Sequence, residues 1–358
     1  MSYVLAFLGF AALIILHEAG HFVAAKAVGM RVERFSLFFG PMVVKRTHGE
    51  TEYGIGVIPL GGYVKITGMN PNEPIPDEWV GRAYYNQAVW KRVVTILAGP
   101  LVNILLAFGI VVALLLSNGQ DGPPVKRIAA VESSTPAAKV LRAGDQIVSV
   151  DGVSGSAEAI RNQIGTHRCA GTPVNGCLAA TPARVVVRRG DKLVDLQIRP
   201  RYSAADKRNE LGFEFAFATV YPSIGGAASG SVSYLWYVTK QTVSTVGRIF
   251  EPKERRQLSG VVGGYTVTQE SFADSASRAF QVLALISLSL GVINLFPFLP
   301  LDGGHVFWAV AEKVRGRRIP FAVMERAGMV GFVLIILLFV VGLSNDISTL
   351  AGKGFGLR

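Results

Sequence analysis

Charged residues are scarce in this chain of 358 residues: Asp, Glu, Lys and Arg together make up 17% of it, against about 25% in a typical soluble domain. This deficit argues against an ordinary water-soluble enzyme. Two cysteines are too few for a disulfide-dense secreted scaffold, and a hydrophobic content of 50% excludes a disordered chain. The net charge of +11 would suit nucleic acid, but no nucleic-acid-binding motif accompanies it, so we expect no such partner.

Four apolar windows are long enough to cross a lipid bilayer, which takes about 20 residues. They comprise residues 2–25, 93–120, 279–301 and 327–345. We do not expect the first window to be a cleaved signal peptide, because no basic segment precedes it and because it contains His17 and Glu18.

Lysine and arginine in the short connections predict the orientation of these windows. Residues 26–92 contain nine of them and residues 303–326 contain five. Short loops that are rich in Lys and Arg stay in the cytoplasm, whereas long segments are exported largely regardless of their charge. We therefore expect both termini and the long segment 121–278 on the extracytoplasmic side.

The first window contains the sequence H-E-x-x-H, formed by His17, Glu18 and His21. Residues four apart share one face of a helix, so both imidazoles can bind a single metal ion. Glu18 stands beside them, where it can accept a proton from water at the metal. The alternative is a polar kink that neighbouring helices satisfy, but three ionisable groups inside a membrane are costly without a function.

A zinc site needs a third protein ligand, and Asp302 is the carboxylate at the end of the third window. Pro297 and Pro300 precede it and Gly303-Gly304 follow it. The prolines break the helix, and irregular backbone at membrane depth survives only where it is buried in protein or lines a cavity. Asp302 is therefore placed to turn towards the histidines, although the simple alternative is a residue that caps a helix end.

These residues resemble the site-2 protease family, the intramembrane zinc metalloproteases of regulated intramembrane proteolysis. The similarity rests on three motifs in the family's order: His17-Glu18-Ala19-Gly20-His21, Gly99-Pro100-Leu101-Val102-Asn103 and Asn294-x-x-Pro297-x-x-x-x-Asp302-Gly303. It covers nearly the whole chain. The chain most resembles the bacterial branch that carries a PDZ domain between the second and third spans, which implies a bacterial inner or plasma membrane.

The resemblance assigns the chemistry to four residues, namely the Zn²⁺ ligands His17, His21 and Asp302 and the catalytic base Glu18. Asn294 would hold the substrate backbone or the developing oxyanion, and a hydrogen bond between helices is its alternative role. Asn103 is expected to support the helix core or to serve the site. His305 has no role in the family pattern and is expected in a loop.

Residues 52–67, between the first two windows, are rich in β-branched residues and are broken by Gly and Pro, which predicts a β-hairpin or a small sheet. In the family, a matching segment dips into the membrane beside the metal. A helix buries its own amides, so a protease must hold its substrate extended, and an exposed edge strand can do this by pairing with the substrate backbone. The residues expected to pair are Gly62, Tyr63, Val64 and Lys65. A cytoplasmic hairpin packed on the helices is the alternative.

Residues 121–220 are expected to form an extracytoplasmic α+β domain. A Gly-Asp turn at Gly144, an alternating strand and an Asp-Gly turn at Asp151 resemble a PDZ domain, a module that binds extended peptides by strand addition. This domain could bind a peptide or protein, or it could act as a purely steric filter; the sequence leaves both roles open. The oxidising exterior favours a disulfide between Cys169 and Cys177, with two free thiols as the alternative.

The predicted fold is a polytopic α-helical membrane protein with four transmembrane helices, a membrane-associated β-hairpin and an extracytoplasmic PDZ-like α+β domain. We expect four segments along the chain. Residues 1–120 and 279–358 form the membrane core, residues 121–220 form the PDZ-like domain, and residues 221–278 form an amphipathic connector at the membrane interface.

The predicted function is that of an intramembrane zinc metalloendopeptidase. The resemblance alone implies the substrate: a single-pass membrane protein already cut outside, such as an anti-sigma factor or a signal-peptide remnant. A non-catalytic membrane scaffold or chaperone with a PDZ domain is the alternative. A metal transporter is less favoured, because transporters usually show internal repeats and we find none in this sequence.

Overall fold

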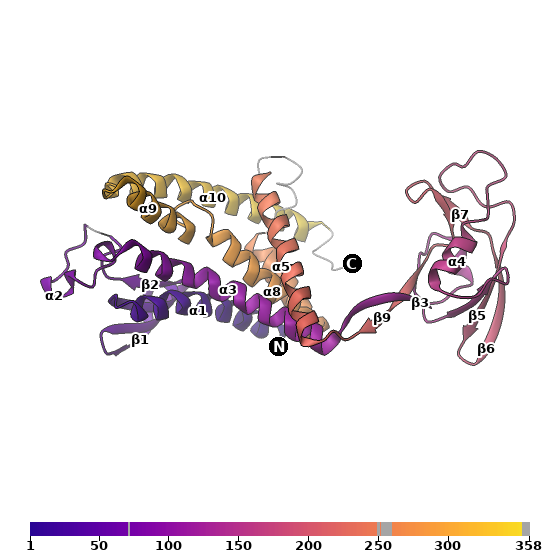
Figure 1. Ribbon diagram of the computed structural model, residues 1–358, viewed down its shortest axis with the longest axis horizontal. Helices are drawn as coiled ribbons and strands as arrows, with labels where there is room; N and C mark the ends of the chain where they lie inside the picture. Colours follow the sequence, from indigo (N-terminus) through magenta and orange to yellow (C-terminus); the bar gives the residue numbers. More distant parts are fainter. Residues whose placement is uncertain (71, 249–250, 252–259, 353–358) are drawn as a thin grey trace. The chain divides into compact units, whose positions relative to one another are not determined.

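The computed structural model describes residues 1–70, 72–248, 251 and 260–352 (Figure 1). The chain forms two compact units. The helical unit consists of Met1–Ser117 and the chain from Ser223 onwards, and the sheet unit consists of Asn118–Pro222.

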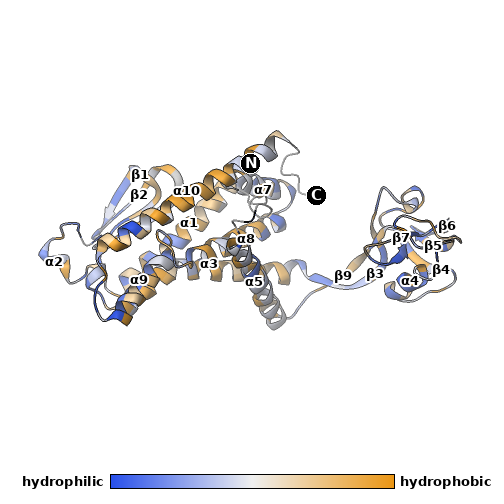
Figure 2. Cartoon of the chain, turned by 90° about the horizontal axis from the view of Figure 1, so that it is seen from above, coloured by the Kyte–Doolittle hydropathy of each residue, from blue (hydrophilic) through white to orange (hydrophobic). Residues whose placement is uncertain are grey.

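Four long helices dominate the helical unit: α1 Ser2–Ala27, α3 Val89–Asn118, α8 Ala276–Asn294 and α10 Phe321–Ala351. Within the described residues, these are the helices long and apolar enough to cross a membrane. Hydrophobic residues line them along most of their lengths (Figure 2). The four predicted spans are therefore confirmed as helices, and the chain is a multi-pass membrane protein.

The helix of the third window ends before the apolar run does, at the break that the two prolines predict. Helix α8 ends at Asn294 rather than near residue 301, and α9 then runs from Asp302 to Arg315. Pro297 and Pro300 lie in the connection, where their rings exclude helical backbone and they donate no amide hydrogen. The break therefore starts a new helix at Asp302.

The β-structure predicted between the first two spans is larger than one hairpin. Strand β1 (Val32–His48) and strand β2 (Thr51–Ile66) both bend, so that Phe35 pairs with Val64 on one side and with Tyr53 on the other. The result is a set of antiparallel segments in the order 62–66, 32–37, 51–56 and 42–48. The segment 62–66 thus lies at an edge of this sheet.

Two short helical segments connect this sheet to α3. They are α2 Asp77–Val80 and the 3₁₀ helix η1 Tyr84–Asn86. Tyr84 is buried, and its backbone amide donates to the carbonyl oxygen of Thr67, just after β2. The connection is therefore packed against the sheet.

The sheet unit has the small α+β organisation that the sequence predicts. Its five-stranded antiparallel sheet has the order β6-β5-β4-β3-β9. The strands are β3 Gln120–Val131, β4 Gln146–Val150, β5 Ala183–Arg189, β6 Lys192–Ile198 and β9 Phe213–Val220. The remaining elements are α4 Ala157–Ile164, the 3₁₀ helix η2 Pro136–Lys139 and the short strands β7 Arg201–Ser203 and β8 Arg208–Glu210.

The core of the sheet unit forms where α4 packs on the sheet. Ile160 of α4 is fully buried with Ile128, Ile147 and Val185 from three neighbouring strands. Cys169 and Cys177 form a disulfide that closes a short loop after α4. The unit therefore has a hydrophobic core of its own together with a covalent link.

The connector predicted at 221–278 forms two helices, α5 Ile224–Gly247 and α7 Val261–Asp274. Leu235 and Val238 of α5 are buried in one hydrophobic cluster with residues of α3 and α8. This part of the connector consequently packs on the membrane helices.

Helix α7 is tied to both ends of the helical unit's chain. The hydroxyl of Tyr265 donates to the carbonyl oxygen of Tyr3 at 2.9 Å. The buried carboxylate of Asp346 on α10 accepts hydrogen bonds from the amides of Gly260 and Gly263 at 2.9 Å each. These bonds link α7 to α1 and α10.

Candidate metal centre

His17 and His21 lie one turn apart on α1 and point to the same side. Each is only 7% exposed. Their Nε2 atoms are 3.4 Å apart, as expected when two imidazoles four residues apart on a helix face one point.

Asp302 meets these histidines at the first residue of α9. Its Oδ2 lies 3.3 Å from Nε2 of His17 and 3.2 Å from Nε2 of His21. Three or more His, Cys, Asp or Glu side chains can hold one metal ion when their ligand atoms lie close enough together. Among the described residues, His17, His21 and Asp302 form the group that meets this condition.

Glycine allows Asp302 to reach this position. A Cβ atom on Gly304 would lie 2.5 Å from the backbone nitrogen of Leu299, and one on Gly303 would overlap the carbonyl group of Leu295. The first turn of α9 therefore packs directly on the backbone that follows α8. Larger residues at either position would push Asp302 away from the histidines.

The ring of His21 is oriented by the main chain of α3. Its Nδ1 lies 2.9 Å from the carbonyl oxygen of Thr95, so Nδ1 carries the hydrogen and donates it. Nε2 then presents its lone pair to Asp302 and His17. Such a second hydrogen bond commonly fixes the tautomer of a metal-binding histidine.

Close contact between α1 and α3 makes this bond possible. A Cβ on Gly99 would overlap the ring of His21, and a Cβ on Gly20 would lie 2.6 Å from the carbonyl oxygen of Ala98. Small residues of this kind let membrane helices approach closely. Gly99 of the second motif thus has a direct steric role at the site.

The chemistry of the three side chains suits a divalent cation. Two imidazole nitrogens and one carboxylate oxygen face one another, and this donor set is typical of catalytic zinc sites. In the described part of the chain, Oδ2 of Asp302 is buried without a hydrogen-bond partner. A shared cation would satisfy all three groups, so the residues present fit a metal ion.

Glu18 lies beside the edge of the sheet in the helical unit. A Cβ on Gly62 would be 3.0 Å from Cγ of Glu18, and the carboxylate lies close to the backbone amide of Val64. The edge segment 62–66 therefore passes next to Glu18, the neighbour of His17 in the sequence.

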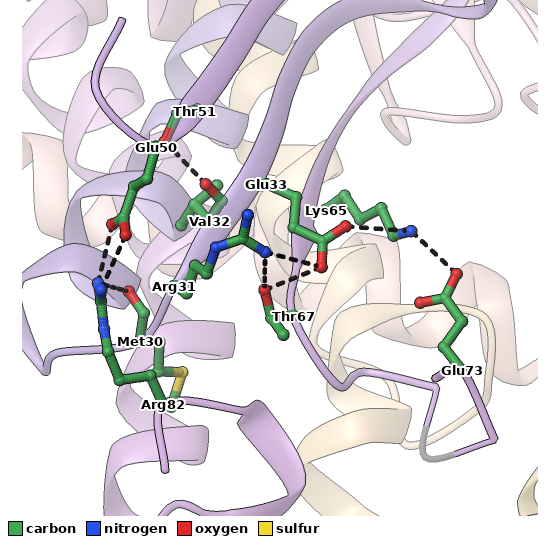
Figure 3. A network of polar contacts seen from close by, with 10 residues as sticks. All are labelled: Met30, Arg31, Val32, Glu33, Glu50, Thr51, Lys65, Thr67, Glu73 and Arg82. Atoms are coloured by element: carbon green, nitrogen blue, oxygen red, sulfur yellow. Dashed lines mark hydrogen bonds and ion pairs between the residues drawn. The ribbon is translucent and has the colours of Figure 1, made fainter. Parts of the chain in front are cut away.

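A polar network holds the base of this sheet (Figure 3). Glu33 contacts Arg31 at 3.3 Å and Lys65 at 3.2 Å, and accepts a hydrogen bond from Thr67 at 2.9 Å. At the other end of the sheet, Val43 and other apolar side chains are exposed. The sheet is thus polar at its base and apolar at its tip.

Glu50 connects the base of the sheet to its surroundings. It binds Arg82 at 2.8 Å and Lys26, at the end of α1, at 2.6 Å. The hydrogen bonds from Arg82, helped by those from Lys26, lower the pKa of Glu50 to about 2 from its usual 4.5. This ionised carboxylate joins the sheet to the helix that carries both histidines.

Three other residues singled out in the sequence lie on helices of the helical unit. Asn294 is the last residue of α8 and is partly buried, and its role stays a prediction. Asn103 is fully buried on α3, where its backbone carbonyl oxygen accepts a hydrogen bond from the hydroxyl of Ser287. The loop expected at His305 was wrong, because α9 already starts at Asp302.

Sequence reasoning missed Thr95, because its contribution is a backbone carbonyl, which any residue could provide at that position. Gly99 was part of a recognised motif. Its contact with His21 depends on how α1 and α3 cross, so the local sequence could not predict it.

Comparison with known proteins defines the class. A sequence model of the family described as peptidase family M50 matches residues 5–338. The chain therefore belongs to peptidase family M50 and is a membrane metalloprotease. The resemblance drawn from the three motifs is confirmed at the level of the family.

Three relatives are similar over most of their lengths. A proposed zinc metalloprotease of Clostridium acetobutylicum is 28% identical, with 96% of each chain covered. A proposed zinc metalloprotease of Brucella suis is 30% identical, with 93% of this chain and 92% of the relative covered. Zinc metalloprotease Rip1 of Mycobacterium tuberculosis is 31% identical, with 84% and 83% covered.

Two solved structures are similar to part of the chain. The PDZ domain of an SdrC-like protein from Listeria monocytogenes is 23% identical with a TM-score of 0.20, covering 27% of this chain and 88% of that one. The corresponding domain from Listeria innocua is 19% identical with a TM-score of 0.22, covering 28% and 99%.

Proposed function

We propose that this membrane metalloprotease binds zinc through His17, His21 and Asp302 and uses Glu18 as its catalytic base. The observation that carries the proposal is the convergence of the two Nε2 atoms and Oδ2 of Asp302 within 3.4 Å of one another. Zinc as the cofactor is also supported by the relatives, which are described as zinc metalloproteases.

The side chains divide the work of peptide hydrolysis. A zinc ion in such a site polarises a carbonyl group and makes water nucleophilic near neutral pH. Glu18 accepts the proton of the attacking water and passes it to the leaving amine. Asn294 donates a hydrogen bond to the substrate backbone or to the oxyanion. Thr95 keeps Nε2 of His21 free of its hydrogen.

The substrate is a membrane-spanning protein whose chain becomes extended at the site. The edge position of segment 62–66 supports backbone pairing by Gly62, Tyr63, Val64 and Lys65, because the described residues include no strand on its other side. The contact between Gly62 and Glu18 would bring a paired peptide bond next to the base. The exposed apolar tip of the sheet supports its insertion into the membrane.

The substrate class follows from the family resemblance: a single-pass protein already cut outside, such as an anti-sigma factor or a signal-peptide remnant. The sheet unit is proposed as an extracytoplasmic PDZ-like domain that selects such substrates, by binding a peptide or by its bulk. Both termini are proposed to be extracytoplasmic in a bacterial inner or plasma membrane, because the basic short connections favour a cytoplasmic location.

Reconstitution tests this proposal against its rivals. The purified protein is placed in vesicles with a model membrane-spanning substrate, and wild type is compared with Glu18→Gln and with Asp274→Asn, a control in an exposed ion pair. We expect wild type and the control to cleave, and Glu18→Gln and chelator-treated protein to be inactive. Equal cleavage with Glu18→Gln would contradict the enzyme assignment and favour a scaffold. Metal flux into the vesicles without cleavage would favour a transporter.

A further inference from the structure

A partly buried ion pair joins α3 to α9 and includes none of the three metal ligands. Nη2 of Arg92 lies 2.6 Å from Oε2 of Glu312, and each side chain is only 12% exposed. The other oxygen of Glu312 accepts a hydrogen bond from the amide of Ile319. The guanidinium of Arg92 lies 5.8 Å from the ring centre of the buried Tyr84.

Both partners lie on helices that contribute to the metal centre: α3 provides the carbonyl oxygen of Thr95, and α9 carries Asp302. Arg92 lies about one turn before Thr95, whose carbonyl oxygen orients His21. Glu312 lies on the same helix as Asp302, near its other end. We propose that the Arg92–Glu312 pair positions Asp302 against His17 and His21. This proposal rests on the metal centre proposed above and extends it to two residues that touch no ligand.

The geometry of α9 explains why its far end matters. The first turn is held where Gly303 and Gly304 press on the backbone of residues 295–299. Glu312 lies ten residues further along, about 15 Å at 1.5 Å per residue. With the first turn as the pivot, a tilt of about 4° moves Glu312 by about 1 Å and turns the carboxylate of Asp302 together with the helix. Metal sites tolerate distance errors of only about 0.2 Å, so a helix whose direction is not fixed at its far end would leave the orientation of the carboxylate poorly defined.

Stability alone is a poor reason for this pair. Two charges drawn partly out of water lose hydration that their attraction barely repays, so such an ion pair is often no more stabilising than apolar residues of similar size. Within the described residues, Nε of Arg92 is also buried without a hydrogen-bond partner. What the pair supplies is a single defined distance between α3 and α9.

The test uses the full-length protein in detergent, freed of metal, with Co²⁺ alone as the probe. Co²⁺ reports ligand geometry through its visible absorption spectrum. The main variant is the double substitution Arg92→Met with Glu312→Met, which removes both charges together. Arg92→Lys keeps the charge. Asp195→Asn is the matched control, since it breaks an exposed ion pair with Arg184 in the sheet unit.

We expect the double variant to fold, to bind Co²⁺ about 10- to 100-fold more weakly and to show an altered spectrum, as when outer-shell partners of a metal site are lost. Arg92→Lys should lose less affinity, and Asp195→Asn should match wild type. A folded double variant with wild-type affinity and spectrum would overturn the proposal. A double variant that cannot fold would also overturn it, because the pair would then serve the fold as a whole. Failure of wild type to bind Co²⁺ would instead overturn the metal centre itself.

Discussion

Nδ1 of His21 lies 2.9 Å from the backbone carbonyl oxygen of Thr95, so the main chain of α3 orients a proposed metal ligand on α1. The bond exists only because the two helices touch at Gly20 and Gly99. The metal centre is thus an outcome of helix packing as much as of the H-E-x-x-H sequence.

Replacing Gly99 should damage the site without unfolding α3. In Gly99→Ala the new methyl group overlaps the ring of His21, so we expect metal affinity and proteolysis to fall about 10- to 100-fold, as for other changes around metal ligands. Gly109→Ala on the same helix is the control, because its Cβ has no atom within 4 Å. Metal titration of both proteins measures the effect, and equal affinities would contradict it.

The ion pairs of Glu50 should make stability depend on pH in the acid range. Its pKa is about 2 when folded and about 4.5 otherwise. A lowered folded pKa contributes stability above pH 4.5, which is lost as pH falls from about 4.5 to 2. Melting temperatures across this range should fall less steeply for Glu50→Gln than for wild type. Parallel curves for the two proteins would show that Glu50 does not stabilise the fold in this way.

Backbone pairing with the substrate predicts a difference between two changes at Val64. Val64→Pro removes the amide beside Glu18, whereas Val64→Ala keeps it. We expect cleavage to be lost in Val64→Pro and largely retained in Val64→Ala, with metal binding intact in both. If the proline variant binds metal and still cleaves at the wild-type rate, the substrate does not pair at this amide.

The disulfide should stabilise the sheet unit and leave the metal centre unaffected. Closing a loop of this size is worth about 2–3 kcal/mol. The full-length protein with Cys169→Ser and Cys177→Ser should therefore show a lower unfolding temperature for the sheet unit, with unchanged Co²⁺ affinity. Calorimetry and metal titration measure both, and an unchanged unfolding profile would argue that the link carries no stability.

The sequence predicts some parts of this structure well for physical reasons. His17 and His21 are four residues apart, so helix geometry alone brings them together. The spans follow from continuous apolar windows. Asp302 is 281 residues from His21, so its role was indicated only by its place after two prolines at the end of the third window and by the family resemblance. The Arg92–Glu312 pair and the Thr95 carbonyl have no local signal, since each depends on how separate helices cross.

The sheet of the helical unit shows the same limit. Residues 52–67 carry the β-branched pattern and form β2. The partner strand β1 bends and pairs on two sides, and this depends on register shifts along both strands that the alternation of residue types does not specify.

X-ray absorption at the zinc edge of the metal-loaded protein tests the central claim most directly. For wild type we predict two imidazole nitrogens and a carboxylate oxygen at about 2.0–2.2 Å from zinc, and for Asp302→Ala the loss of the carboxylate. An Asp302→Ala spectrum identical to that of wild type, or a sulfur ligand in either protein, would contradict the account.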